Sequence, residues 1–462
     1  MAARSKVLVM GGGPAGSVTA TALAREGLEV TLIEGARFPR YHIGESLTPS
    51  CRAVLAAIGV ADTLDRHGFT IKHGGAFRWD ADSWVFDWGA EVGSRSWQVD
   101  RSEFDDLLLR HAAACGVAVS TGVSARQVIF DGDRPAAVTC TPDAGAPFTI
   151  DDFDYLVDAT GRHGLLSVRR FGNRRPLANL RNIGVWGYWT GAGLLPETPT
   201  GGINIISAPE GWFWVIPLAG DRTSIGYVTR KDAFVRDRAT FPSLDAYYGH
   251  MVAVAPVVDG LVAGARYQGP ARVETDYSYI ADQFCGPGYF LVGDAACFLD
   301  PLLSTGVHLA LYSGLTAAAC IVSVARGEVT EPAALRFFEF AYRRAYTRLF
   351  ALVSVMYERY LGKDGFFRTS ERLIGDDLAP PTESYAFAEI IAGLSDLREA
   401  ADSSTRVLTE RLTQEALKVQ LRSIEGAAAP DFTSVLGNPL RDAESAEYRL
   451  TTAPRLGLQR LR

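Results

Sequence analysis

The sequence lacks the cysteine patterns that mark metal-binding or redox-active proteins. Its 462 residues include only six cysteines, and no two of them form a C-x-x-C pair. A zinc site and a thioredoxin-like redox pair are therefore not expected, and we expect no metal site. Scattered cysteines of this kind predict buried free thiols in a reducing compartment; they are Cys51, Cys115, Cys140, Cys285, Cys297 and Cys320.

Clusters of positive charge are also absent. The chain has 46 Lys and Arg against 53 Asp and Glu, which gives a net charge of -7 at pH 7. Proteins that bind nucleic acid neutralise phosphates with grouped Lys and Arg side chains. Nucleic acid is therefore not an expected partner, whereas a small substrate or an acidic protein partner remains open.

The sequence has no segment that clearly predicts a signal peptide or a membrane span. Residues 1–6 lead into a short apolar run without the charged-then-apolar order of a cleavable signal. The most apolar helical stretch, Val307 to Ala325, contains His308, Tyr312 and Gly314, which favours a buried helix over a membrane span. We therefore expect a cytoplasmic protein. Internal repeats and heptads are absent too, and 47% apolar residues predict a large core in two or three structural units.

A glycine-rich turn near the N-terminus is the first positive signal. The apolar run Lys6 to Met10 ends in Gly11-Gly12-Gly13-Pro14-Ala15-Gly16, and helical spacing follows from Ser17 to Glu26. A second apolar run ends at Glu34, 18 positions after Gly16. This order predicts a Rossmann-like unit in which the helix N-terminus binds a pyrophosphate and Glu34 accepts hydrogen bonds from a ribose. The expected pyrophosphate-binding residues are Gly11, Gly13, Pro14, Ala15 and Gly16.

Two later segments favour a flavin over NAD. The segment Phe153 to Arg162 resembles the strand and turn that close the cofactor cleft in flavoproteins of the glutathione-reductase type. The segment Tyr289 to Ala296 resembles their later strand and turn, where Asp294 would meet the ribityl chain of FAD. The ordinary alternative for Asp294 is a helix N-cap or turn residue, and both roles are compatible. The resemblance implies FAD contacts from Glu45, Ser46, Arg101, Gly293 and Asp294.

We predict an α/β protein with a Rossmann-like FAD-binding domain, an antiparallel β-sheet substrate domain and a C-terminal helical extension. The FAD-binding domain is expected to comprise residues 1–180 and 268–330. Residues 181–267 alternate between apolar and polar side chains and should form the sheet of the substrate domain together with residues 70–100. Residues 331–462 should be mainly helical. They contain helical spacing near 385–397 and 406–421 and a loop-like stretch near 426–439.

Three motifs narrow the function. The segment Trp212-Phe213-Trp214-Val215-Ile216-Pro217, together with Lys72 in its sequence context, resembles the signature of the flavin-dependent halogenases. The run from Phe298 to Gly306 resembles a third motif of that family, which opens a helix; its matching positions are Phe298, Pro301, Ser304 and Gly306. Class A aromatic hydroxylases and isoprenoid reductases share the fold, so only these local motifs separate the functions.

The resemblance implies a defined chemistry. FADH2, O2 and chloride or bromide would yield hypohalous acid, and Lys72 would pass the electrophilic halogen to an aromatic carbon. Backbone N–H groups of Thr305 and Gly306 at a helix start would bind the halide. Lys72 would need a pKa lowered by desolvation in order to act as an amine nucleophile. The ordinary alternative for this residue is a solvated surface lysine.

The remaining motif residues are expected to form a wall rather than to perform a chemical step. Trp212 and Trp214 should place both indoles on one face of a strand that Pro217 ends, although large aromatics are commonly ordinary core residues. Phe298, Pro301 and Ser304 are expected to line the same active site. Some halogenases attach FAD covalently through an aspartate, for which Asp276 is the candidate here.

One departure from the family pattern bears on the substrate. Leu303 stands where tryptophan halogenases carry a Glu, so free tryptophan is not the expected substrate. The sequence most resembles halogenases of aromatic acyl groups held on an acyl or peptidyl carrier protein. We therefore expect a phenolic acyl substrate, or else a pyrrolic one, in the biosynthesis of a halogenated natural product such as an antibiotic. A separate flavin reductase is the expected second component. The main alternative function is an FAD-dependent aromatic hydroxylase.

Overall fold

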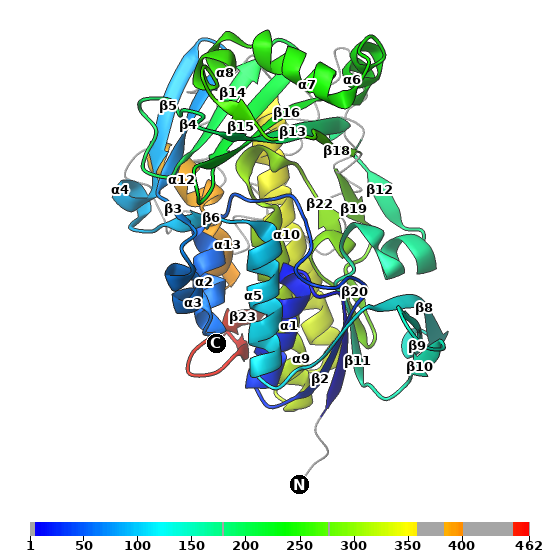
Figure 1. Cartoon of the computed structure of the whole chain (residues 1–462). Coiled ribbons are helices and arrows are strands. Elements are labelled where there is room, and N and C mark those ends of the chain that lie inside the picture. Colours follow the sequence, from blue (N-terminus) through cyan, green and yellow to red (C-terminus); the bar gives the residue numbers. More distant parts are fainter. Residues whose placement is uncertain (1–4, 178–179, 276–277, 358–382, 401–446, 462) are drawn as a thin grey trace, which may run out of the picture.

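The computed structural model describes residues 5–177, 180–275, 278–357, 383–400 and 447–461. Its lower part in Figure 1 contains a six-stranded sheet that is parallel except at one edge. The strands β1 and β11 carry continuous apolar residues because helices cover both faces of such a sheet. Their order is β20 (Cys285–Gly286), β21 (Tyr289–Leu291), β11 (Tyr155–Asp158), β1 (Lys6–Met10), β2 (Glu29–Glu34) and β7 (Ala118–Thr121).

Three helices pack together beside this sheet. Helix α1 (Pro14–Arg25) contacts both α5 (Arg101–Ala114) and α9 (Gly306–Ala325). The predicted order of strand, glycine turn, helix and strand over residues 6–34 is therefore confirmed. Helix α10 (Glu331–Tyr357) packs on α9 and runs from the parallel sheet toward the second sheet (Figure 1).

The upper part of Figure 1 is an eight-stranded sheet. All its pairs are antiparallel except β14 with β4, which shows that residues from the 70s join this sheet through one parallel contact. Strand β18 lies beyond residue 267 and still pairs with β13. The strands are β4 (Gly74–Trp79), β5 (Asp82–Asp87), β13 (Asn182–Thr190), β14 (Ile203–Ala208), β15 (Gly211–Pro217), β16 (Arg222–Arg230), β17 (Arg266–Tyr267) and β18 (Arg272–Thr275).

The two faces of this upper sheet belong to different cores. On β15, Phe213 and Val215 enter a smaller core, which includes tyrosines of α7. Trp212 and Trp214 enter the main core on the opposite face. The predicted alternation of this strand is thus confirmed. The helices that follow the sheet strands in this part of the chain are α6 (Lys231–Arg238), α7 (Leu244–Ala253) and α8 (Pro256–Leu261).

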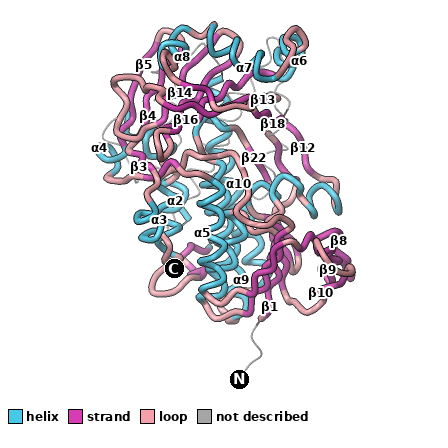
Figure 2. Tube along the Cα trace, viewed as in Figure 1, coloured by secondary structure: helices cyan, strands magenta, loops and turns pink. Residues whose placement is uncertain are grey.

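Smaller elements lie between the two parts or beside the lower one; Figure 2 shows their distribution. Among the described residues the helical ones include α2 (Pro49–Ala57), α3 (Ala61–His67), α4 (Trp88–Val92), the 3-10 turns Gly161–His163, Gly293–Ala295 and Pro301–Leu303, and the π-helix Leu165–Arg170. The strands form three separate small sheets: β3 (Thr70–Lys72) with β6 (Ser96–Gln98); β8 (Val123–Asp131) with β9 (Arg134–Pro142) and β10 (Phe148–Ile150); and β12 (Arg174–Pro176) with β19 (Tyr279–Ala281) and β22 (Cys297–Phe298).

The C-terminal part contains both helices and a hairpin. Helices α12 (Glu383–Ile391) and α13 (Leu394–Ala400) occupy the segment predicted as helical from 385 to 397, and Gly393, at φ +70°, separates them. Strands β23 (Tyr448–Thr451) and β24 (Gly457–Arg460) then pack on α9, because Leu450, Leu456 and Leu458 are buried there. The predicted helix at 406–421 and the loop at 426–439 lie outside the described residues.

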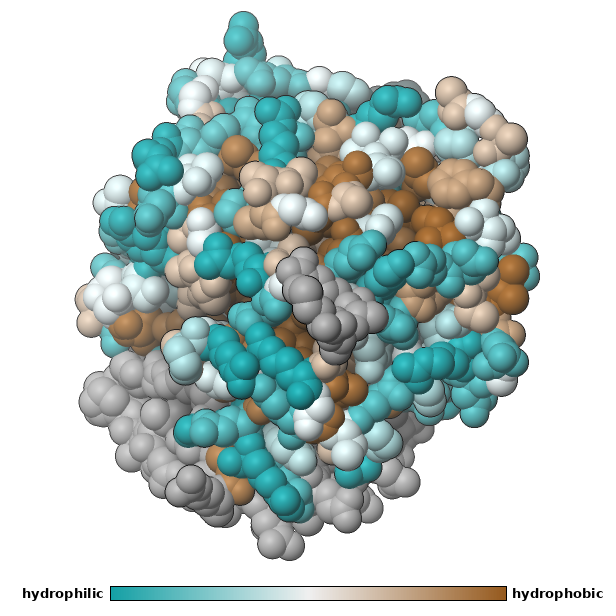
Figure 3. Space-filling model, turned by 90° about the horizontal axis from the view of Figure 1, so that it is seen from below, coloured by the Kyte–Doolittle hydropathy of each residue, from teal (hydrophilic) through white to brown (hydrophobic). Residues whose placement is uncertain are grey.

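One described helix, α9, is long and apolar enough to cross a membrane, but 94% of its most apolar window is buried inside the protein. The expectation of a buried helix is thus confirmed. Figure 3 shows the face opposite the upper sheet, where polar side chains surround separate apolar patches. The cysteines are free thiols, five of them buried and Cys115 half-buried. Within the described ranges, no group of three His, Cys, Asp or Glu is placed to hold a metal.

Candidate active site

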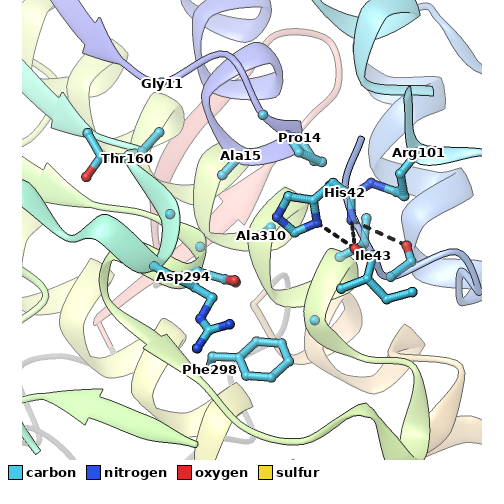
Figure 4. A pocket seen from close by; sticks show the side chains of 18 of the residues that line it. Gly11, Pro14, Ala15, His42, Ile43, Arg101, Thr160, Asp294, Phe298 and Ala310 are labelled. Atoms are coloured by element: carbon cyan, nitrogen blue, oxygen red, sulfur yellow. Dashed lines mark hydrogen bonds between the residues drawn. The ribbon is translucent and has the colours of Figure 1, made fainter. Parts of the chain in front are cut away.

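A cavity of about 630 Å³ begins at the glycine turn after β1 and extends to the upper sheet. Gly11, Pro14 and Ala15 lie on one side of it, and Asp294 and Phe298 lie across from them (Figure 4). Arg101 approaches from a third side. The cavity therefore brings together segments that are nearly 300 positions apart in the sequence.

The glycines of the turn have different physical roles. A Cβ at Gly11 would lie 2.1 Å from the carbonyl oxygen of Ala159, and a Cβ at Gly16 would lie 1.9 Å from that of Gly11. These two glycines therefore allow neighbouring backbone segments to pack closely against each other. A Cβ at Gly13 would meet only the Arg40 guanidinium, at 3.3 Å, so open space lies in front of this residue.

That space suits an anion. Gly13 is the N-cap of α1, and no side chain caps this helix start. Unpaired N–H groups and the helix dipole favour a phosphate at such a position. The Arg40 guanidinium supplies a positive charge beside it and lines the same cavity. The turn can therefore bind a pyrophosphate directly at its backbone, where its glycines carry no side chains.

Glu34 lies at the end of β2 and lines the cavity. Its two carboxylate oxygens accept hydrogen bonds from the backbone N–H groups of Gly12 and Ala36, each at 2.7 Å. A carboxylate has about four acceptor sites, so capacity for ribose hydroxyls remains. The predicted acid is thus held rigidly beside the glycine turn.

Asp294 and Arg101 provide opposite charges farther along the cavity. Burial raises the pKa of the Asp294 carboxyl to about 6, while the positive charge of Arg101 acts in the opposite direction. Arg101 is itself held by Asp105, whose Oδ1 accepts from Nε at 2.8 Å, and by the Ile43 carbonyl, which accepts from Nη1 at 2.8 Å. Together with the glycine turn and Glu34, these groups fit FAD.

The far end of the cavity is formed by the turn that precedes α9. Ser304 has φ +58°, a strained conformation for a residue other than glycine, and it turns the chain from the 3-10 segment into α9. Gly306 lines the cavity, and a Cβ there would meet the Phe298 ring at 2.8 Å. No side chain caps α9, and the buried Thr305 hydroxyl has no partner in the described part of the chain.

The Trp-x-Trp segment forms the roof of this end. Trp214 lines the cavity, and its indole lies so close to β16 that a Cβ at Gly226 would approach it to 2.0 Å. The indole rings of Trp212 and Trp214 are 6.1 Å apart, on the same face of β15 as predicted, and Pro217 is the last residue of the strand. Trp212 instead donates its indole N–H to the Tyr357 hydroxyl at 2.8 Å.

Lys72 lies immediately behind the cavity wall. Its Nζ donates to the Ser46 hydroxyl at 2.7 Å and to the Leu47 carbonyl at 3.1 Å, and it lies 4.6 Å from the centre of the Trp88 ring. The side chain is 1% exposed, and no carboxylate pairs with it among the described residues. Burial lowers its pKa to about 7. Lys72 is therefore a desolvated amine rather than a surface charge.

The structure brings most of the predicted site residues to one cavity. Those that line it are Gly11, Gly13, Pro14, Ala15, Glu34, Glu45, Ser46, Arg101, Trp214, Gly293, Asp294, Phe298, Pro301, Ser304 and Gly306. The other predicted residues that are described do not line it; they are Gly16, Lys72, Trp212, Pro217 and Thr305. Asp276 lies outside the described residues.

Sequence reasoning missed several groups around the cavity. Arg40 follows β2 in the pair Pro39-Arg40, and its closeness to the glycine turn arises in the fold and had no sequence signal. Trp88 carried no such signal because its contact with Lys72 comes from the fold of the segment between β3 and β6. His308, read only as an interruption of an apolar helix, is fully buried and bonds both Ser50 and Asp396.

A family model described as tryptophan halogenase matches residues 6–96 and 89–379 of the chain. This chain belongs to the flavin-dependent halogenases. Tryptophan 2-halogenase of Chondromyces crocatus is 38% identical to this halogenase over 437 residues, which are 94% of this chain and 83% of that protein. The flavin-dependent halogenase armH3 of Armillaria mellea is 35% identical over 96% of this chain and 94% of its own length.

The fold comparison agrees. The structure of the myxobacterial chondrochloren halogenase CndH, an FAD-dependent halogenase, superposes with a TM-score of 0.74 and 30% identity, covering 92% of this chain and 99% of that one. The predicted family and fold class are thus confirmed. Enzymes of this family use FAD, a halide and O2, and the cavity described above contains the groups of this halogenase that fit FAD.

Proposed function

We propose that this halogenase chlorinates or brominates a carbon of an electron-rich aromatic ring, and that Lys72 transfers the halogen. The observation that carries the proposal is the position of Lys72. It is a buried amine without a carboxylate partner among the described residues, bonded to the cavity residue Ser46. With a pKa of about 7, a large fraction of this amine is neutral at neutral pH and available to react with hypohalous acid.

The other groups bind and separate the reactants. The start of α9, at Thr305 and Gly306, would bind the halide through its N–H groups, because no side chain caps this helix. Trp214 would keep the organic substrate away from the cofactor side. When bound, reduced FAD would supply two electrons that bring O2 to the peroxide level, at which its oxygen can oxidise the halide to hypohalous acid. We infer a separate flavin reductase as its source, since the chain has one dinucleotide fingerprint.

The substrate class follows from what the site does not supply. Leu303 is buried and apolar where an acid would polarise the reacting species, so the ring must bring its own nucleophilicity. A phenolic acyl group on a carrier protein meets this need, and a pyrrolic one does as well. The name of the Chondromyces relative makes free tryptophan the competing substrate. We infer natural-product biosynthesis in the cytoplasm as the setting.

The test is a turnover with FAD, NADH, a flavin reductase and chloride or bromide, analysed by mass spectrometry. Substrates are free phenolic acids, their carrier-protein thioesters and free tryptophan, each with and without halide. We expect a product with a halogen isotope pattern that requires halide and disappears in Lys72→Ala. The carrier-protein thioester is expected to be a better substrate than the free phenolic acid.

The same assay can also give results that contradict the proposal. Halogenated tryptophan alone would retain the halogenase and discard the phenolic substrate. A halide-independent gain of one oxygen would identify an aromatic hydroxylase, the main rival. Retention of product in Lys72→Ala would remove the role of the amine.

A further inference from the structure

Glu45 is a carboxylate inside the cavity that the proposed chemistry does not yet use. It is 2% exposed and lines the cavity beside Ser46. Its Oε1 accepts a hydrogen bond from the Tyr188 hydroxyl at 2.7 Å. The Ser224 hydroxyl lies near the carboxylate, but Oε2 makes no hydrogen bond with the described residues. A buried acceptor without a partner needs an explanation.

A chain of hydroxyl groups links this carboxylate to the surface. The Tyr188 hydroxyl, which bonds Glu45, lies 2.9 Å from that of Tyr41. Tyr41 is 44% exposed and also accepts a hydrogen bond from the Trp186 indole at 2.8 Å. Burial raises the pKa of both tyrosines, so each phenol keeps its proton at neutral pH. The path from solvent to cavity therefore consists of protonated hydroxyls that can exchange protons along hydrogen bonds.

The reaction needs such a path. Reduced flavin, O2, one halide ion and one proton give oxidised flavin, one hypohalous acid and one water; the flavin and the halide each lose two electrons, and O2 gains four. The hypohalous acid and the aromatic C–H then give the C–halogen bond and a second water. One proton must therefore enter the buried cavity with every halide.

We propose that Glu45 donates this proton, and that Tyr188 and Tyr41 then reprotonate Glu45 from solvent. The proposal rests on the proposed halogenase chemistry and assigns the route of its proton. In each turnover the Oε–H bond of Glu45 breaks as the proton leaves for the reacting oxygen. A proton from the Tyr188 hydroxyl replaces it, and Tyr41 restores the Tyr188 proton from solvent.

The surroundings of Glu45 set it near the required acidity. Burial raises the pKa of its carboxyl to about 6. Arg222 and Arg101 act against this rise by their positive charge, and Asp100 adds to it. Tyr41 and Tyr188 are the other titratable groups facing it. A donor with a pKa close to the working pH is efficient because both of its protonation states are accessible.

The first test uses the protein without cofactor. Infrared difference spectra between pH 5 and 8 are expected to show protonated carboxyl bands that titrate near pH 6, because burial also raises the pKa of Asp294 and Asp300 to about 6. One of these bands is expected to be lost in Glu45→Gln. Tyr188→Phe keeps the aromatic ring and removes the hydroxyl, so it should shift both the frequency and the midpoint of this band. Tyr248→Phe is the matched control, because its buried hydroxyl donates to the Ile225 carbonyl in the same sheet, away from Glu45.

The second test measures halide oxidation with a nucleophilic trap, across pH and in D2O. Tyr188→Phe and Glu45→Gln are expected to lower kcat at least about tenfold above pH 6, with an increased solvent isotope effect and an unchanged halide KM. Tyr248→Phe should leave the pH profile unchanged.

The two tests separate failure of the proton route from failure of the halogenase function. If Tyr188→Phe and Glu45→Gln both oxidise halide with the kcat of the wild type, the proton route is wrong. A change in KM alone in these variants would also overturn it. If the wild-type protein oxidises no halide, the proposed function fails. The infrared titration still shows whether the Glu45 carboxyl is protonated near pH 6 and bonded to Tyr188. If Glu45→Gln removes no carboxyl band, or if Tyr188→Phe leaves the Glu45 band unchanged, Glu45 is not a proton donor that is hydrogen-bonded to Tyr188.

Discussion

At the scale of single residues, Lys72 shows how the same burial creates reactivity and reduces stability. Its amine is removed from water, bonded only to neutral oxygens and placed over an indole ring. Desolvation disfavours the charged form, so the pKa falls from 10.5 to about 7. The free energy required to bury this amine is the physical origin of its nucleophilicity.

Lys72→Met should abolish halogenation and stabilise the fold. The unfolded lysine titrates at 10.5 and the folded one at about 7, so the folded state binds fewer protons between these values. The penalty from Lys72 is therefore complete below pH 7 and shrinks as pH rises toward 10.5, by about 1.4 kcal/mol per unit. Urea unfolding at pH 6.5 and 9.5 measures the difference, and the gain should be larger at pH 6.5.

The same substitution at the exposed Lys231 is the control for general effects of losing a lysine. It should change neither the activity nor the pH dependence of unfolding. A Lys72→Met protein that is less stable than the wild type at pH 6.5 would contradict the desolvation argument.

At the scale of elements, the start of α9 is fixed by a buried polar network. Ser50 of α2 and Asp396 of α13 bond the two ring nitrogens of His308 at 2.7 and 2.8 Å, and Arg348 of α10 bonds the other oxygen of Asp396 at 2.6 Å. His308 lies two residues after Gly306. The network therefore holds the proposed halide site against the segment that carries Ser46 and Leu47.

His308→Asn should raise the halide KM several-fold while removing roughly 1–3 kcal/mol of stability. The reason is that a shorter side chain cannot keep both bonds, and the first turn of α9 then loses its fixed position. Steady-state kinetics with varied chloride and thermal unfolding measure the two effects. Thr316→Val, in the same helix, is the control because its hydroxyl donates to the Tyr312 carbonyl of the helix itself and has no other hydrogen bond within the described residues. Equal halide KM values in the two variants would contradict the positioning role.

The elements themselves were largely predictable. The strands β1 and β2 and the helices α1 and α9 follow from apolar runs and helical spacing, because their side chains repeat with the period of each structure. The parallel contact between β14 and β4 was not predictable, since it joins residues more than 120 positions apart and no local pattern encodes a partner. The break at Gly393 within the predicted helix depends on tertiary contact, because a Cβ there would lie 2.5 Å from the Ser50 hydroxyl.

At the scale of the whole molecule, long-range contacts hold the chain end and the cofactor domain together. The Glu26 carboxylate at the end of α1 accepts from the backbone N–H of Leu456 at 2.9 Å and pairs with Arg326. The Ser323 hydroxyl accepts from the N–H of Leu458 at 2.7 Å. The hairpin β23–β24 thereby becomes part of the FAD-binding core, although it is remote in sequence.

FAD binding should stabilise the whole protein, by about 2.7 kcal/mol at a free concentration of 100 Kd. Gly13→Ala should fold normally and lose this gain, because its methyl group meets only the end of the flexible Arg40 side chain and occupies the space before the glycine turn. Gly16→Ala should instead lower the Tm without ligand, because its Cβ would overlap the Gly11 carbonyl. Thermal unfolding with and without FAD separates the two effects. An equal loss of ligand-free stability in both variants would contradict this division.

The family, the Rossmann-like unit and the candidate site residues, most of which line the cavity, followed from the sequence. These depend on short motifs whose glycines, acids and aromatics act within one turn or one strand. Tertiary structure alone decided that Lys72 lies behind Ser46 and over Trp88, and that the Glu45 carboxylate connects to solvent through two tyrosines. Burial, pKa and hydrogen-bond partners belong to neighbours in space, and packing chooses those neighbours from segments that the sequence keeps far apart.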